Sequence, residues 1–136
     1  MRLAGIWYNQ LGSKMELVLK QGNLSGWYET AVGSASGPYV LAGRTDTDDD
    51  AARNVGWVVS WENDKGSSDS VTAWSGELQE IDGEEVISTT WLLTIETTPA
   101  TNWKSTLVGK DIFTRTPPDE GSSKRAFLMG MCSNPL

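Results

Sequence analysis

Short stretches of alternating hydrophobic and polar residues recur along the whole chain, separated by clusters of Gly, Asn, Asp and Ser. A period of two is the pattern of a β-strand, and these clusters are typical of turns, so the sequence predicts an all-β protein. No stretch sustains the hydrophobic period of a helix. The eight predicted strands cover residues 4–10, 14–20, 23–30, 38–45, 55–62, 70–80, 85–96 and 103–115.

Two of the connections between these strands have the composition of tight hairpin turns. Gln21-Gly22-Asn23 and Ile81-Asp82-Gly83 contain residues that tolerate a positive φ, as short hairpins require. Eight antiparallel strands form a sandwich or a closed barrel, and closure removes the exposed edges that promote aggregation. We therefore predict an eight-stranded antiparallel up-and-down β-barrel, with a sandwich as the alternative.

The tryptophans share one face of the predicted strands. Side chains two residues apart lie on the same face of a strand. The sets that result combine bulky rings with short polar or aliphatic groups: Trp7, Asn9 and Leu11; Trp57, Val59 and Trp61; Ser70, Thr72 and Trp74; Trp91, Leu93 and Ile95. Because neighbouring strands are antiparallel, the rings gather toward the floor of the barrel and the polar groups toward its mouth. Such an arrangement is typical of a small-ligand site.

The alternative is that these aromatic side chains fill a solid core, as is common in small β-proteins. Inward-facing Asn9, Ser70, Thr72 and Asp111 argue against that interpretation. Each would cost roughly 1–3 kcal/mol if it were buried without a hydrogen-bond partner. A polar ligand would supply those partners, so the sequence favours a binding cavity.

Length and charge limit the classes of function. A length of 136 residues suits one folded domain. We expect residues 1–116 to form the barrel and residues 117–136, which begin with linker composition, to form a flexible tail. A net charge of −7 disfavours binding to nucleic acid or anionic membranes. The chain also has no long apolar run and no signal peptide pattern, so we expect a soluble protein whose compartment the sequence does not indicate.

The reactive side chains are few. The chain has no His and a single Cys, Cys132, which disfavours a histidine base, a zinc site and an internal disulfide. Residues 46–50 begin like a calcium loop, but Ala51 and Trp57 stand where Gly and Glu are needed, so we expect no metal. Asp111 is the one carboxylate expected in the cavity and lacks a second acid or base, so we expect no enzyme.

Several motifs of the chain resemble those of a known protein family. The runs Gly5–Ser13 and Trp103–Asp111, the Trp91-Leu92-Leu93 sequence, and Trp61 placed thirteen residues before Trp74-Ser75-Gly76 resemble the avidin and streptavidin family. The resemblance covers nearly all of residues 3–116, and residues 13–17 and 59–63 look closest to fungal members. It implies non-covalent binding of biotin, with no cofactor, and a biological role in sequestering this vitamin as a defence.

The resemblance also implies a role for each site residue. Asn9, Ser13 and Tyr28 would donate to the ureido oxygen of biotin, and Thr30 and Asp111 would accept from its two N–H groups. Thr72 would contact the sulfur, and Ser34 and Ser70 the carboxylate. The remaining site residues would be apolar: Leu11, Val32, Trp61, Trp74, Trp91 and Leu93. Trp103 would cap the site of a neighbouring subunit, which implies a homotetramer.

Four positions depart from the family pattern. Thr30 replaces a Ser but keeps the hydroxyl, whereas Ser34 replaces an Asn and shortens the reach to the biotin carboxylate. Ile95 replaces a Ser at the mouth, where it could tighten or crowd the valeryl chain. Lys110 places a cation near an expected interface, which is expected to weaken subunit pairing.

A carbohydrate-binding or other small-ligand module is the alternative function. Such a module would use its tryptophans as exposed stacking platforms. The strand parity instead places Trp7, Trp57, Trp61, Trp74 and Trp91 inside and only Trp27 outside.

Overall fold

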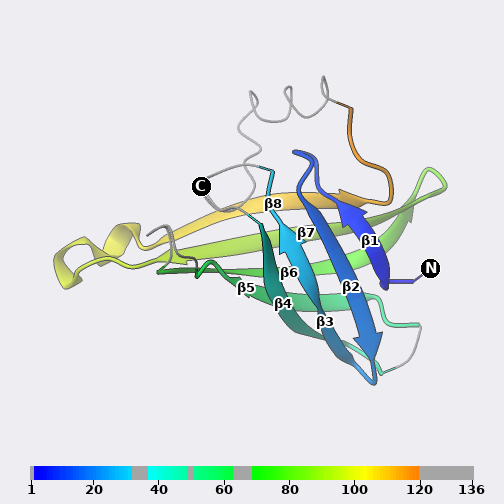
Figure 1. Cartoon of the computed structure of the whole chain (residues 1–136), viewed down its shortest axis with the longest axis horizontal. Coiled ribbons are helices and arrows are strands. Elements are labelled where there is room, and N and C mark those ends of the chain that lie inside the picture. Colours follow the sequence, from blue (N-terminus) through cyan, green and yellow to red (C-terminus); the bar gives the residue numbers. More distant parts are fainter. Residues whose placement is uncertain (1, 32–36, 49–50, 63–68, 120–136) are drawn as a thin grey trace.

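The computed structural model describes residues 2–31, 37–48, 51–62 and 69–119. Its eight strands form one closed barrel in the order of the sequence, so the predicted up-and-down β-barrel is confirmed (Figure 1). The strands are β1 (Gly5–Tyr8), β2 (Lys14–Lys20), β3 (Asn23–Glu29), β4 (Pro38–Thr45), β5 (Asn54–Ser60), β6 (Ser70–Ile81), β7 (Glu84–Ile95) and β8 (Thr106–Thr114).

Neighbouring strands are antiparallel throughout, but the pairing is uneven around the barrel. β6 and β7 pair along their whole length, from Ser70 opposite Ile95 to Ile81 opposite Glu84. β1 and β8 close the barrel, yet Tyr8 opposite Thr114 is the pair that joins them. The seam between β1 and β8 therefore depends on contacts outside the regular strand ladder.

The two predicted hairpin turns are confirmed by their backbone geometry. Gln21 and Gly22 have φ angles of 51° and 77°, and Asp82 and Gly83 have φ angles of 52° and 81°. Two consecutive residues with positive φ match the twist of the strands that they join. One turn joins β2 to β3 and the other joins β6 to β7, and both lie at the same end of the barrel (Figure 1).

The structure corrects the boundaries of the first and last predicted strands. β1 ends at Tyr8 rather than residue 10, because the backbone N–H of Asn9 donates to the carbonyl of Ser13 in a turn. β8 begins at Thr106 rather than residue 103. The residues before it form a short 3-10 helix, η1 (Pro99–Lys104), with Pro at its start and a capping box formed by Thr98 and Thr101. No helix within the described ranges is long and apolar enough to cross a membrane.

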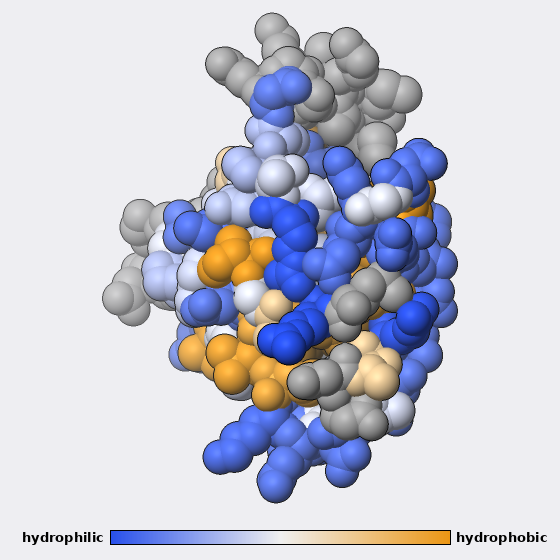
Figure 2. Space-filling model, turned by 90° about the vertical axis from the view of Figure 1, so that its right-hand side faces the viewer, coloured by the Kyte–Doolittle hydropathy of each residue, from blue (hydrophilic) through white to orange (hydrophobic). Residues whose placement is uncertain are grey.

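A set of side chains closes the end of the barrel at which β1, β3, β5 and β7 begin. The indole Nε1 of Trp7 donates to the carbonyl of Leu3 at 2.7 Å, and the guanidinium of Arg115 lies 3.7 Å from the centre of the Trp7 ring. Arg115 also pairs with Glu85 at 3.3 Å and donates to the carbonyl of Arg2. Figure 2 views this end, where hydrophilic residues cover much of the visible surface beside hydrophobic patches. Entry to the barrel interior is therefore expected at the other end.

Candidate ligand-binding site

Buried polar side chains gather at the mouth, the end where β1, β3, β5 and β7 finish. Burying a polar side chain inside a barrel costs free energy unless the side chain is hydrogen-bonded. Four polar side chains of this barrel are nevertheless at most 1% exposed. They are Asn9, Ser13, Thr72 and Asp111. All four belong to the predicted site, and they come from the loop after β1, from the start of β6 and from β8.

Asp111 lies at the centre of this polar group. Its Oδ2 accepts from the indole Nε1 of Trp74 at 2.8 Å, and its Oδ1 accepts from the side-chain Nε2 of Gln10 at 2.8 Å. The Thr89 hydroxyl donates to the main-chain carbonyl of Asp111 at 2.8 Å and so fixes the strand at this point. The donors from Trp74 and Gln10 are both neutral, and they orient the carboxylate. A buried carboxylate acceptor of this kind suits a ligand that presents N–H groups.

Asn9 organises the loop between β1 and β2. Its Oδ1 accepts from the backbone N–H groups of Leu11 at 3.0 Å and Ser13 at 2.9 Å, which is a local turn typical of Asn. This contact directs the Nδ2 group inward, where it lies 3.3 Å from the Tyr28 hydroxyl and 3.5 Å from Oδ1 of Asp111. The donor side of the Asn9 amide thus lies between Tyr28 and Asp111 inside the barrel.

Two hydroxyl groups complete this donor set. Ser13 Oγ accepts from the backbone N–H of Ala31 at 3.0 Å, and that bond does not use the hydroxyl hydrogen. Tyr28 is fully buried, and its hydroxyl accepts from Asn9. Both hydroxyl oxygens act as acceptors in these bonds, and a hydroxyl group is able to donate as well as to accept.

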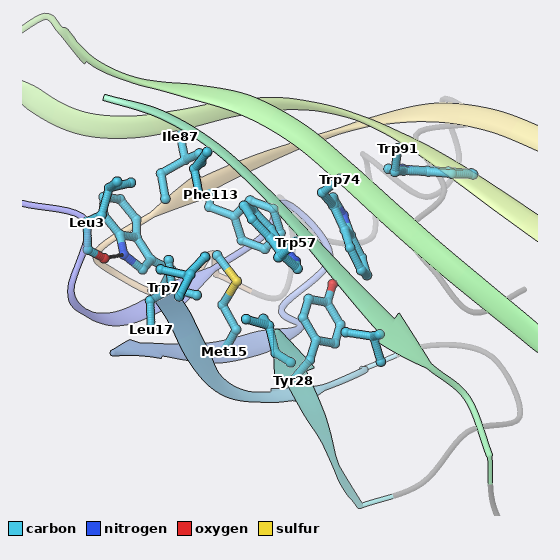
Figure 3. Close-up of a cluster of buried hydrophobic side chains, with 14 of the residues drawn as sticks. Leu3, Trp7, Met15, Leu17, Tyr28, Trp57, Trp74, Ile87, Trp91 and Phe113 are labelled. Carbon is cyan, nitrogen blue, oxygen red and sulfur yellow. Dashed lines mark hydrogen bonds between the residues drawn. The ribbon is translucent and has the colours of Figure 1, made fainter. Parts of the chain in front are cut away.

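Aromatic rings line the barrel beneath and beside these polar groups. Tyr28 contacts Trp61 edge-on at 5.8 Å between ring centres and Trp74 at 5.0 Å, and Trp57 stacks on Trp74 at 5.5 Å. Figure 3 shows the hydroxyl of Tyr28 directed toward the Trp57 and Trp74 rings, with Trp91 on the far side of Trp74. The rings of Tyr28, Trp57, Trp61 and Trp74 therefore contact one another and form one aromatic wall.

Two further contacts fix the wall in place. The indole Nε1 of Trp61 donates to the Thr72 hydroxyl at 2.8 Å, which leaves the Thr72 hydrogen for another acceptor. The ring of Trp91 lies against Gly109 on β8, where a Cβ atom would come within 2.2 Å of the indole. Glycine at 109 is thus required for the observed position of Trp91.

The other predicted site residues occupy different depths. Leu11 and Leu93 are buried, whereas Thr30 and Ser70 are half-buried. Val32 and Ser34 lie outside the described residues. Trp103 is 80% exposed on η1, so a single chain does not bring it into its own site. Ile95 is 36% exposed and pairs with Ser70 at the end of β7.

Gln10 is the residue that the sequence prediction missed. Gln10 is the last residue of the predicted strand 4–10, but β1 ends at Tyr8 and the side chain of Gln10 turns back to Asp111. Its position between Asn9 and Leu11 in the first motif was the signal that could have drawn attention to it.

The positions of these side chains also bear on the alternative functions, a carbohydrate-binding module, an enzyme or a metal site. Five of the seven tryptophans are buried, and Trp27 is half-buried with its Nε1 bound to Glu16. The chain therefore has few exposed tryptophans on which a sugar ring could stack. Among the described residues, Asp111 is the one buried carboxylate, and no three acidic, His or Cys side chains are grouped as a metal site would need.

Comparison with known proteins identifies the family of this chain. A model of the Avidin family matches residues 1–116. Avidin of Gallus gallus is 35% identical over 121 residues, which cover 83% of this chain and 77% of avidin. Fibropellin-1 of Strongylocentrotus purpuratus is 32% identical over 119 residues, 83% of this chain but 11% of that protein. Afifavidin of Afifella pfennigii is 35% identical over 91 residues, 64% of this chain and 54% of afifavidin. The chain therefore belongs to the avidin family.

Proposed function

We propose that this protein binds biotin non-covalently in the mouth of its barrel. The avidin family binds biotin and is not enzymatic. The observation that carries the proposal is the buried carboxylate of Asp111, which neutral donors hold close to the inward-facing amide of Asn9. One strong acceptor beside a group of donors complements the ureido group of biotin, which has one carbonyl oxygen and two N–H groups.

In this pose, the ureido oxygen lies among three donors, Asn9 Nδ2 and the hydroxyls of Ser13 and Tyr28. The 3.3 Å contact between Asn9 and Tyr28 supports this placement, because it brings two of these donors together. Asp111 and Thr30 accept from the two ureido N–H groups. Five fixed partners then match the hydrogen-bonding groups of the ureido ring.

The rest of biotin lies along the wall toward the mouth. Thr72 donates its hydroxyl hydrogen toward the sulfur, which is supported by the Trp61 bond that already uses Thr72 Oγ1 as an acceptor. Ser34 and Ser70 contact the carboxylate at the rim. The bicyclic ring and valeryl chain contact apolar side chains: Leu11, Val32, Trp61, Trp74, Trp91 and Leu93.

We further infer that four copies assemble into a homotetramer. Val58, Leu92 and Val108 are 47%, 51% and 68% exposed, and they lie in register across β5, β7 and β8 through Ala73. A continuous apolar band of this kind is typical of an interface. Trp103, exposed on η1, would then cap the site of a neighbouring subunit. In this assembly the protein sequesters biotin, which suits a role in defence.

Lys110 modifies this expectation for the assembly. It lies two residues after Val108 on the same face of β8, and its ammonium donates to the Thr90 hydroxyl at 3.1 Å. A cation within an apolar contact carries a desolvation cost. We therefore expect the tetramer to be weakened at this point.

A thermal unfolding experiment tests the proposed ligand. Biotin at saturating concentration should raise the melting temperature, because a ligand that binds only the folded state stabilises it by mass action. Valeric acid at the same concentration is the matched control, since it has the carboxylate and chain but not the ureido ring. An unchanged melting temperature with biotin would contradict the proposal.

A further inference from the structure

The side chain of Gln10 bridges the weakest seam of the barrel. Beyond Tyr8, β1 no longer pairs with β8. Gln10 nevertheless binds three successive residues of β8 through its amide. Its Nε2 donates to Oδ1 of Asp111 at 2.8 Å and, at 3.4 Å, to the carbonyl of Lys110, and its Oε1 accepts from the N–H of Ile112 at 2.9 Å.

The two ends of this amide have different consequences. The bond from Ile112 N–H to Oε1 replaces a missing rung of the strand ladder and holds the β1–β2 loop against β8. The bond from Nε2 to Asp111 acts on a buried side chain instead. Because one planar amide makes both bonds, the position of β8 determines where the donor for Asp111 lies.

Asp111 needs more than one donor to have a single orientation. Trp74, on β6, holds Oδ2, and the Asn9 amide lies 3.5 Å from Oδ1, at the outer limit of a hydrogen bond, so these two contacts set the plane of the carboxylate only loosely. Gln10 holds the other oxygen from the opposite element, and the two bonds at 2.8 Å together fix the plane of the carboxylate. An acceptor whose direction is fixed before binding loses less entropy when a ligand N–H arrives.

We propose that Gln10 is a positioning residue for ligand binding, which acts by fixing the carboxylate of Asp111. This inference rests on the proposed function, because the benefit is to a ligand that donates to Asp111. Gln10 itself does not contact the ligand, since both ends of its amide bind β8.

Two substitutions separate positioning from simple closure of the seam. Gln10→Glu keeps an acceptor for Ile112 N–H but replaces the donor that faces Asp111 with a carboxylate oxygen. Gln10→Met removes all three bonds to β8 at similar side-chain volume. Gln79→Met is the matched control, because Gln79 is also half-buried and its Nε2 binds an exposed side chain, Glu77, at 2.8 Å.

The test is a double-mutant cycle for biotin affinity with Asp111→Ala. Gln10→Met should weaken binding about tenfold in the natural background, the effect of one hydrogen bond to a charged group, and less than about twofold when Asp111 is already absent. Gln10→Glu should weaken binding at least as much as Gln10→Met, and Gln79→Met should leave it unchanged. Equal losses from Gln10→Met in both backgrounds would overturn the inference, because they would show a role in the seam alone.

A second readout keeps the two proposals distinguishable. If the natural protein fails to bind biotin, the proposed function is wrong, and the same cycle is then measured on the free energy of unfolding in urea. Coupling between Gln10 and Asp111 in that cycle would support the positioning contact without any ligand. Additive effects on unfolding would overturn it. Gln10→Glu serves in both cycles if Gln10→Met does not fold.

Discussion

The indole Nε1 of Trp74 donates to Oδ2 of Asp111 at 2.8 Å, across the barrel from β6 to β8. Since β7 lies between these two strands, the bond links strands that are not neighbours in the sheet. It links the aromatic wall to the central polar group of the site. A change at either residue is therefore expected to affect both the shape and the polarity of the cavity.

Asp111→Ala should weaken biotin binding far more than Ser70→Ala. The first substitution removes a buried charged acceptor, for which we expect a loss of roughly ten- to a hundredfold, whereas the second removes a half-buried hydroxyl at the rim. Equilibrium titration of both variants provides the comparison. Similar losses would show that the depth assigned to the two residues is wrong.

The same Asp111 substitution should also lower stability. It leaves the buried indole N–H of Trp74 without the acceptor that it has in the natural protein, at a cost of about 1–3 kcal/mol. Urea unfolding, followed by circular dichroism, measures this change separately from affinity. A variant as stable as the natural protein would indicate that another group accepts from Trp74.

Gly109→Ala should displace the ring of Trp91. The added Cβ would lie 2.2 Å from an indole carbon, and overpacking of this kind typically costs about 1–3 kcal/mol. Both the melting temperature and the biotin affinity should fall. Gly56→Ala is the control, because its Cβ would meet the nearest atom at an ordinary 3.5 Å. Equal effects of the two substitutions would contradict the packing assigned to Trp91.

Trp103→Lys should speed biotin release and loosen the assembly together. The substitution replaces an exposed interface aromatic with a charge, if Trp103 caps a neighbouring site. Ile81→Lys, at the opposite end of the barrel, changes another exposed hydrophobic residue and should affect neither property. The off-rate and the mass by light scattering are measured on the same preparation. An unchanged off-rate in an intact tetramer would rule out the cap.

The closed end should lose stability in acid through Glu85. Burial raises the pKa of Glu85. The backbone N–H of Arg2 and the charge of Arg115 together lower it by more than burial raises it, so the pKa of Glu85 is below its ordinary value. A group with a lowered pKa stabilises the fold above its unfolded pKa and loses that contribution as the pH falls through its folded pKa. Glu85→Gln should therefore be less stable than the natural protein at pH 7, and the difference should vanish in strong acid. A difference that does not depend on pH would contradict this account.

The sequence predicted the barrel and its strand order because both depend on local patterns. The turns at Gln21-Gly22 and Asp82-Gly83 follow from the preference of those residues for positive φ. The inward tryptophans follow from the period of two along each strand.

Other features differ from the prediction because a capping signal or a contact between distant residues outweighs the hydrophobic pattern. The 3-10 helix before β8 forms because Pro99 begins it and Thr98 and Thr101 cap it, which shortens a strand that the hydrophobic pattern extended to residue 103. Gln10 reaches the site because β1 ends early, so parity no longer applies to it. The proposed cap by Trp103 involves a second chain, so it came from the family resemblance and not from the strand pattern.

Isothermal titration calorimetry of the natural protein with biotin tests the central claim most directly. We predict a saturable signal with about one biotin for each chain, because one barrel encloses one ligand of this size. Asp111→Ala, measured alongside, should bind more weakly with the same stoichiometry. The absence of binding by the correctly folded natural protein at micromolar biotin would contradict the account.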